Sequence, residues 1–131
     1  MGASERVDRV RSLLDAIAHE SLAGAVDVIE TRTRSGAVFR VTGSVGGADV
    51  EVGYEWEVHL WLQVGTTWRV DAQEDLLDDI LDEWRGLTGL AKRIATGVEV
   101  LPDGPDCEAW VSSNGVGLQR IEQRRWPWRG R

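Results

Sequence analysis

The sequence predicts an α+β fold in which a four-stranded antiparallel meander is packed on one face by two helices and is followed by short C-terminal strands. The expected order of elements is α-β-β-β-β-α-β-β-β. Two segments, residues 4–22 and 75–95, carry apolar residues at spacings of three and four, which is typical of helices. Between them apolar and polar residues alternate, and glycine-containing turns divide this stretch into strands.

The first helix is predicted over residues 4–22. Its apolar stripe comprises Val7, Val10, Leu14, Ile17 and Ala18. Ser4 is a suitable N-cap, and Gly24 is a suitable C-terminal stop because glycine tolerates positive φ. His19 falls on the polar side of this helix, so we expect it to be solvated.

The turns predict the register of the strands, because residues that face each other in an antiparallel ladder share one face of the sheet. A tight turn at residues 46–47 would form three apolar pairs: Val41 with Val52, Phe39 with Tyr54 and Ala37 with Trp56. A three-residue loop over 34–36 would place Ile29 opposite Val41 and Glu30 opposite Arg40.

A three-residue loop over 65–67 aligns the last two strands of the meander. The apolar pairs are then Val64 with Trp68, Leu62 with Val70 and Leu60 with Ala72. The polar pairs are Gln63 with Arg69, Trp61 with Asp71 and His59 with Gln73. The three turns agree on one core face, which comprises Ile29, Phe39, Val41, Val52, Tyr54, Trp56, Leu60, Leu62, Trp68 and Val70.

A second helix, from near Asp75 to Ala95, supplies the layer that an apolar sheet face requires. We expect it to break at Gly86 or Gly89, because glycine weakens a helix interior. Its first turns are acidic and its last turn is basic, as the helix dipole favours.

Three short strands are expected after this helix, over residues 98–101, 108–112 and 116–121. Asn114 and Gly115 form a strong turn signal between the last two. The resulting hairpin has apolar residues on both faces, with Val111 and Leu118 on one and Trp110 and Ile121 on the other. It therefore either extends the sheet or closes over one of its ends.

The length of 131 residues suits one domain, which we place at residues 1–121, followed by a basic tail at 122–131. Cys107 is the single cysteine, so no intrachain disulfide can form, and we interpret it as an incidental loop residue. No apolar stretch is long enough to cross a bilayer and the first residues have no apolar signal core, so we expect a cytoplasmic location.

Catalytic and cofactor signatures are missing from the sequence: it has no Rossmann or Walker glycine pattern, HExxH, CxxC or GxSxG. The acidic run over residues 74–83 lacks the glycine turns that accompany calcium ligands. We therefore expect no catalytic residue, no cofactor and no metal.

Charge is divided unevenly within a net charge of −7. Residues 49–83 hold eleven carboxylates and one base, Arg69. On the polar sheet face and the second helix, the candidate partner-binding residues are Glu51, Glu55, Glu57, His59, Trp61, Asp71, Asp75, Asp79 and Asp82. Trp61 is discordant on a polar face, so either it anchors a partner or another part of the chain covers it.

The C-terminal tail interleaves arginine and tryptophan, with Arg124, Arg125, Trp126 and Trp128 as its candidate contact residues. We expect the tail to dock on the acidic sheet or helix of its own chain, and contact with another protein chain is the alternative. A nucleic acid or a membrane is a less favoured partner, because the acidic body would repel both.

The leading hypothesis is a non-enzymatic module that binds a basic protein, since complementary charge speeds encounter and makes binding salt-sensitive. One alternative is a small-ligand-binding protein or hydrolytic enzyme with a pocket between sheet and helices. A further alternative is a homodimer formed through the open sheet face. The order of elements resembles that of small acidic secretion chaperones and of some cystatin-like and immunity proteins, in topology only.

Overall fold

The structure is a computed structural model that describes residues 3–56, 58–102 and 107–121. Its elements are α1 (Ala3–Ser21), β1 (Asp27–Arg32), β2 (Gly36–Thr42), β3 (Val50–Glu55), β4 (His59–Val64), β5 (Trp68–Gln73), α2 (Leu77–Ala95), β6 (Ala109–Val111) and β7 (Gly117–Arg120). Within the described residues, seven strands form one antiparallel sheet in the order β1-β2-β3-β4-β5-β7-β6. The predicted α+β class is confirmed, although the meander has five strands instead of four and residues 98–101 form no strand.

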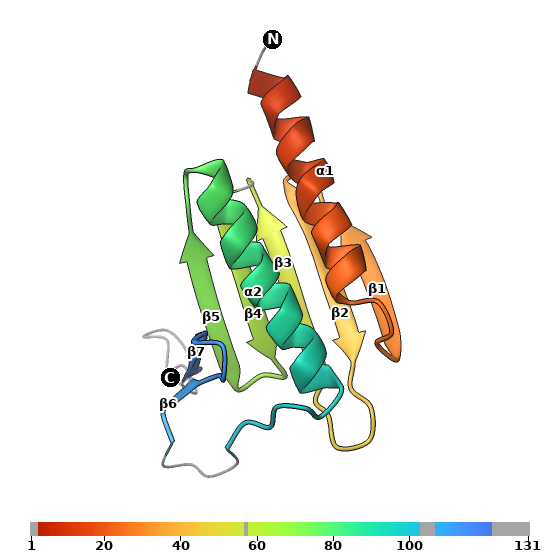
Figure 1. The fold of residues 1–131 in the computed structure, drawn as a ribbon, viewed down its shortest axis with the longest axis vertical. Helices are drawn as coiled ribbons and strands as arrows, with labels where there is room; N and C mark the ends of the chain where they lie inside the picture. The colour runs from red at the N-terminus through yellow and green to blue at the C-terminus, as the bar shows by residue number, and fades with distance from the viewer. Residues whose placement is uncertain (1–2, 57, 103–106, 122–131) are drawn as a thin grey trace, which may run out of the picture.

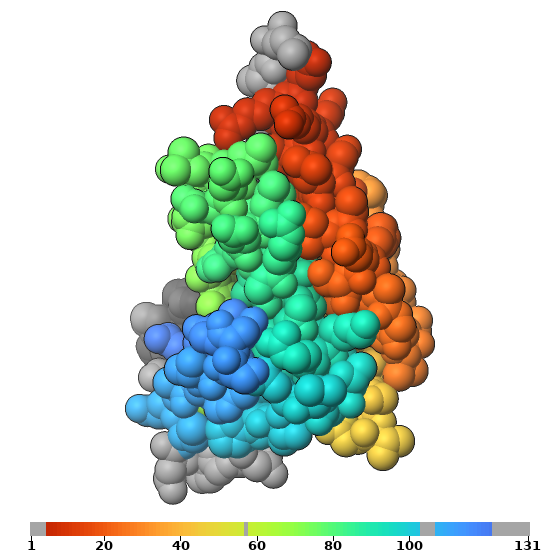
Figure 2. Space-filling model, viewed as in Figure 1, coloured from red at the N-terminus to blue at the C-terminus, as the bar shows by residue number. Residues whose placement is uncertain are grey.

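Both helices lie on one face of the sheet, side by side (Figures 1 and 2). Trp84 of α2 lies at the centre of the core between helices and sheet. Its ring contacts the Phe39 and Tyr54 rings with centroids 6.3 and 5.5 Å away. Its indole N–H donates to the Leu14 carbonyl at 2.7 Å, so its buried polar atom is satisfied and α1 is tied to α2.

Helix α2 runs from Leu77 to Ala95 without the break predicted at Gly86 or Gly89. Apolar side chains on its inner face are buried along its whole length, from Ile80 to Ile94. That continuous packing outweighs the intrinsic cost of about 1 kcal/mol for each glycine.

The predicted register of β4 and β5 is confirmed, with Val64 opposite Trp68 and Trp61 opposite Asp71. Between β2 and β3 the predicted register is wrong by two residues, so Phe39 faces Val52 rather than Tyr54. The connection spans seven residues because it is tied to the end of α2, where the Ser44 N–H donates to the Ala95 carbonyl at 2.8 Å. A shift of two preserves the side-chain alternation, so the predicted faces remain correct.

Strand β1 departs from its predicted register by one residue, which exchanges its two faces. Ile29 therefore lies on the outer side of the sheet and is 54% exposed, instead of being buried in the core. The hairpin is closed at Thr33, whose N–H donates to the Gly36 carbonyl at 2.8 Å. Only residues 34–35 remain as the loop, which explains the change from the predicted three-residue turn.

Polar side chains join α1 to the sheet beside Val28, the residue of β1 that packs against the core. Asp15 accepts a hydrogen bond from the Tyr54 hydroxyl at 2.7 Å and forms an ion pair with Arg32. His19, which we expected to be solvated, is exposed but lies 3.2 Å from Glu30. Burial and the bond to Asp15 raise the pKa of Tyr54, so its hydroxyl remains a donor at neutral pH.

The β6–β7 hairpin extends the sheet at the edge of β5, where Arg120 faces Trp68 (Figure 1). Trp110 faces Leu118, so the predicted grouping of Val111 with Leu118 is wrong. The Ser112 N–H donates to the Val116 carbonyl at 2.9 Å, which leaves a three-residue loop and shifts the register by one. Leu118 is buried against the core, whereas Val111 is exposed.

Candidate functional site

The outer face of the sheet brings together most of the predicted partner-binding residues, as the alternation of β3, β4 and β5 requires. We call this group the Trp61 cluster; it comprises Glu51, Gly53, Glu55, His59, Trp61, Arg69 and Asp71. Glu57 lies outside the described residues. The cluster is therefore a single patch built from three neighbouring strands, on the side of the sheet opposite the helices.

Trp61 lies flat against the sheet and is only 9% exposed. Its ring crosses Gly53 of β3, where a Cβ atom would come within 2.4 Å of the Trp61 Cζ2 atom. The indole N–H donates to Glu51 Oε2 at 3.2 Å. The Arg69 guanidinium lies 5.5 Å from the ring centroid, and the His59 ring lies 5.3 Å away. This tryptophan offers little surface to a partner.

The carboxylates of the Trp61 cluster are paired with cations of the same face. Arg69 donates two hydrogen bonds to Asp71, both of 2.9 Å, and His59 Nε2 lies 2.9 Å from the same carboxylate. Glu51 forms an ion pair with Arg40 at 3.5 Å. The hydrogen bond from Arg69 holds the pKa of Asp71 below its usual range, burial opposes this shift, and His59 adds to it. The negative charges of Asp71 and Glu51 are therefore balanced by arginines of the same face.

The pairing also limits acid–base chemistry at His59. Its Nε2 faces Asp71 at 2.9 Å and its Nδ1 lies 3.4 Å from Glu55 Oε1. A general base needs one ring nitrogen within reach of a substrate proton. Because carboxylates occupy both nitrogens, the geometry suits a structural crosslink between strands better than catalysis.

The remaining predicted acids, Asp75, Asp79 and Asp82, lie apart from the Trp61 cluster, because α2 covers the opposite face of the sheet. Asp75 precedes the first residue of α2, whereas Asp79 and Asp82 lie on it, and all three are exposed. Among the residues that the structure describes, these three form one ion pair, between Asp82 and Arg85 at 3.5 Å. Burial, and then the charge of Glu74, raise the pKa of Glu83 nearby.

Trp56, which is predicted in the core face, is a surface residue. Strand β3 ends at Glu55, and Trp56 adopts a positive φ of 55°. It is 62% exposed, and its backbone N–H donates to the Ser35 carbonyl at 2.8 Å. The connection contains none of the glycine, proline or asparagine residues that usually mark turns, so the sequence carries no signal for this change.

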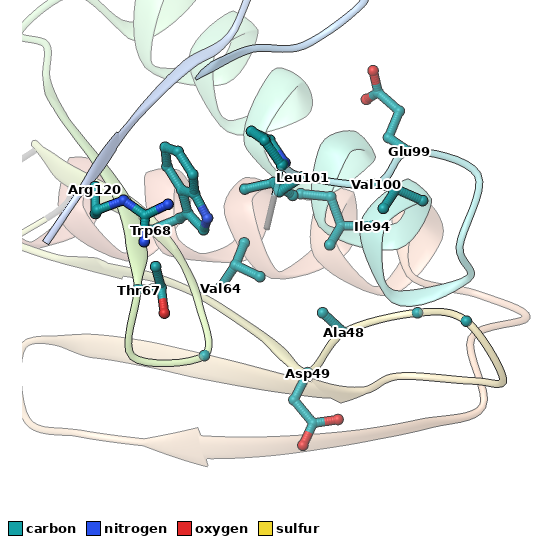
Figure 3. Close-up of a pocket in the computed structure, with 14 residues that line it drawn as sticks. Ala48, Asp49, Val64, Thr67, Trp68, Ile94, Glu99, Val100, Leu101 and Arg120 are labelled. Carbon is teal, nitrogen blue, oxygen red and sulfur yellow. The ribbon is translucent and has the colours of Figure 1, made fainter. Parts of the chain in front are cut away.

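A cavity of about 450 Å³ lies between the end of the sheet and the C-terminal end of α2 (Figure 3). Val64, Trp68, Ile94 and Leu101 form its apolar side. The Arg120 guanidinium lies 4.8 Å from the Trp68 ring, and its Nε donates to the Cys107 carbonyl at 2.7 Å. In Figure 3 the carboxylates of Asp49 and Glu99 point away from the apolar group.

Glu99 at the rim of this cavity is held by the chain itself. It accepts hydrogen bonds from the Ser113 N–H at 2.7 Å and from Arg93 at 3.2 Å. Burial would raise the pKa of this carboxyl, but the hydrogen bonds outweigh it and lower the pKa. Glu99 therefore joins the loop after α2 to the C-terminal hairpin.

Across residues 3–56, 58–102 and 107–121, no three His, Cys, Asp or Glu side chains converge in a way that could hold a metal ion. In the same part of the chain, no helix combines the length and apolar character needed to cross a bilayer. Cys107 is half-buried, and its thiol donates to the Ala109 carbonyl at 3.2 Å. The predicted tail contacts, Arg124, Arg125, Trp126 and Trp128, lie outside the described residues.

Comparison with known proteins finds no protein family, no curated protein and no solved structure that matches this chain.

Proposed function

We propose that this protein is a non-enzymatic binding module that recognises a basic protein partner, as an inhibitor, an immunity protein or a chaperone would. One observation carries the proposal. The carboxylates of residues 74–83 outnumber the cations that pair with them, whereas in the Trp61 cluster Asp71 pairs with Arg69 and Glu51 pairs with Arg40. The surface at the start of α2 is therefore the main source of unbalanced charge among the predicted residues.

Unbalanced surface charge acts mainly on the rate of association. An acidic patch attracts a basic partner over roughly a Debye length, about 8–10 Å at physiological ionic strength. The carboxylates remain exposed before binding, so little desolvation opposes the first encounter. Binding should therefore weaken steeply as salt is added.

Immobilised full-length chain, incubated with native lysate at low salt, tests this proposal. We expect a basic protein to be retained and then released by salt. The triple variant Asp75→Asn, Asp79→Asn, Asp82→Asn should retain it about tenfold less. The matched control makes the same change of charge on α1, with the substitutions Glu5→Gln, Asp8→Asn and Glu20→Gln. Retention of only salt-indifferent partners, or equal losses in both variants, would contradict the proposal.

A second candidate function rests on the cavity beside Trp68. Its volume of about 450 Å³ lies within the range of small-molecule sites, and its apolar side suits a compact apolar ligand. A fragment screen by methyl NMR would test it, because a bound fragment must shift the methyl resonances of Ile94 and Leu101. If no fragment shifts them, the ligand-binding alternative is set aside.

A further inference from the structure

Two large apolar side chains stand exposed at one corner of the molecule, near the end where α2 begins. Trp56 is 62% exposed and Leu76 is 68% exposed. The Glu74 N–H donates to the Val58 carbonyl at 3.0 Å. Trp56 lies two residues before Val58 and Leu76 lies two residues after Glu74, so this bond holds both segments at the same corner. We call Trp56, Leu76, Asp75, Asp78 and Asp79 the Trp56 corner.

Trp56 is a poor choice for the backbone conformation that it adopts. A φ of 55° is readily accessible to glycine, but it is strained for a bulky aromatic residue. The exposed indole recovers little through burial. The contacts described for this side chain therefore do not offset the backbone strain.

Leu76 is likewise a poor choice for its position. It occupies the N-cap of α2 with φ −87° and ψ 136°, and its side chain makes no capping hydrogen bond. Serine, threonine, aspartate or asparagine would satisfy one of the free N–H groups of the first turn there. Leucine leaves that bond unmade and exposes its own apolar surface.

Trp56 and Leu76 thus both disfavour the local fold, and both present apolar surface to solvent. Departures from local rules are expected where a residue serves a purpose other than stability. Tryptophan is also enriched among the residues that dominate binding energy in protein interfaces. Both properties indicate that this corner is a contact surface.

Charge at the Trp56 corner indicates which partner it fits. Asp75, Asp78 and Asp79 are all exposed beside the apolar pair. Arg6 of α1 reaches this segment, and it donates to the Asp75 carbonyl at 3.3 Å rather than to a carboxylate. An apolar centre with an acidic rim complements a segment that places apolar side chains among lysines and arginines.

We infer that Trp56 and Leu76 form the apolar anchor of a docking site for a basic, amphipathic segment of another protein. This inference rests on the proposed function and adds the position of the anchor and the pattern of the partner. Charge brings the partner to the corner, and burial of the two apolar side chains retains it. Loss of the anchor should therefore increase the dissociation rate more than it changes the association rate.

Two labelled peptides of equal length and charge test the inference, one built from lysine and leucine and the other from lysine and serine. Fluorescence anisotropy measures their affinities for the full chain. We expect the lysine–leucine peptide to bind about tenfold more tightly than the lysine–serine peptide. Trp56→Gly and Leu76→Ser should each remove most of that difference, and neither substitution threatens the fold, because glycine suits the positive φ and serine suits the N-cap.

The matched control is Val98→Ser, which removes an apolar side chain with a similar exposed fraction of 71% at a distant turn. It should leave both affinities unchanged. Equal affinities of the wild-type chain for the two peptides, or an effect of Val98→Ser as large as that of Trp56→Gly, would overturn the inference. Failure of both peptides to bind would overturn the inference together with the proposed binding of a basic protein. A dimeric mass in sedimentation that Trp56→Gly reduces to a monomer would identify a second copy as the occupant and overturn the inference.

Discussion

The two tryptophans of the β3–β4 hairpin occupy opposite environments. Trp61 projects from the outer, polar face of the sheet and is 9% exposed, whereas Trp56 continues the apolar alternation of β3 and is 62% exposed. The alternation of apolar and polar residues alone predicts that Trp61 is exposed and that Trp56 is buried. The exposed fraction of each aromatic side chain therefore depends more on its local partners than on its position in the alternation.

Gly53 and the end of β3 account for the difference. Gly53 leaves space on the outer face into which the Trp61 ring fits, and Glu51 satisfies the indole N–H. Trp56 lies one residue beyond the end of its strand, next to the last residue pair of β2 and β3, and only its backbone continues toward Ser35 through the N–H. One ring is covered by its own sheet, and the other is held out by a turn.

Filling the space at Gly53 should have the largest effect. Gly53→Ala places a Cβ atom 2.4 Å from Trp61 Cζ2, so the indole must leave the sheet. We expect the free energy of unfolding to fall by about 2 kcal/mol, as for other overpacked sites. Urea denaturation measures the loss, and quenching of tryptophan fluorescence by acrylamide reports the newly exposed ring.

The control for this prediction is Gly86→Ala in α2, where the new Cβ atom would lie 3.7 Å from Val116 Cγ2, an ordinary contact. Alanine should stabilise this helix interior by about 0.5–1 kcal/mol. If Gly53→Ala proved as stable as the wild-type chain, Trp61 would not depend on the space at Gly53, and the comparison between the two tryptophans would fail.

Releasing the strained turn at Trp56 should have the opposite sign and a smaller effect. Trp56→Gly relaxes a φ of 55°, and little buried surface is lost with the exposed indole. We expect the free energy of unfolding to rise by about 1 kcal/mol. Thermal and urea denaturation of the same variant measure the gain. A loss of stability would show that Trp56 packs on the fold, and its surface role would then be abandoned.

Much of the fold was predictable because packing and turn chemistry agree in the centre of the sheet. Val64 faces Trp68 and Trp61 faces Asp71 as predicted, since a short loop and two apolar faces permit one register. The edge strand β1 was not predictable in the same way. Val28 takes the place of Ile29 opposite Val41, and Glu30 lies under α1 with His19, so the apolar pattern of this strand does not by itself determine its register.

The shared face of the Trp61 cluster was predictable, but its electrostatics were not. The sequence placed Glu51, His59, Trp61 and Asp71 on one face, and the structure brings them together. The number of carboxylates does not show that Arg69 pairs with one of them, because that pairing depends on rotamers and register. Trp56 was assigned to the wrong environment for a simpler reason: its strand ends without a turn residue.

Removing one charge pair of the Trp61 cluster should have the smallest effect. The pKa of Asp71 is lowered, mainly by Arg69, so this interaction stabilises the folded protein above the ordinary pKa of aspartate, about 3.9. It is lost as the pH falls through the lower folded pKa. Because the Asp71 side chain is 48% exposed, Asp71→Asn should reduce the free energy of unfolding at pH 7 by less than about 1 kcal/mol.

A double-mutant cycle with Arg69→Gln, measured by urea denaturation between neutral and acidic pH, isolates this pair. The coupling should be present at pH 7 and should vanish in acid, where Asp71 is protonated in both states. A coupling that stayed constant across this range would mean that Arg69 and Asp71 act through packing. In that case packing, and not charge, would hold the Arg69 side chain beside Trp61 on the outer face.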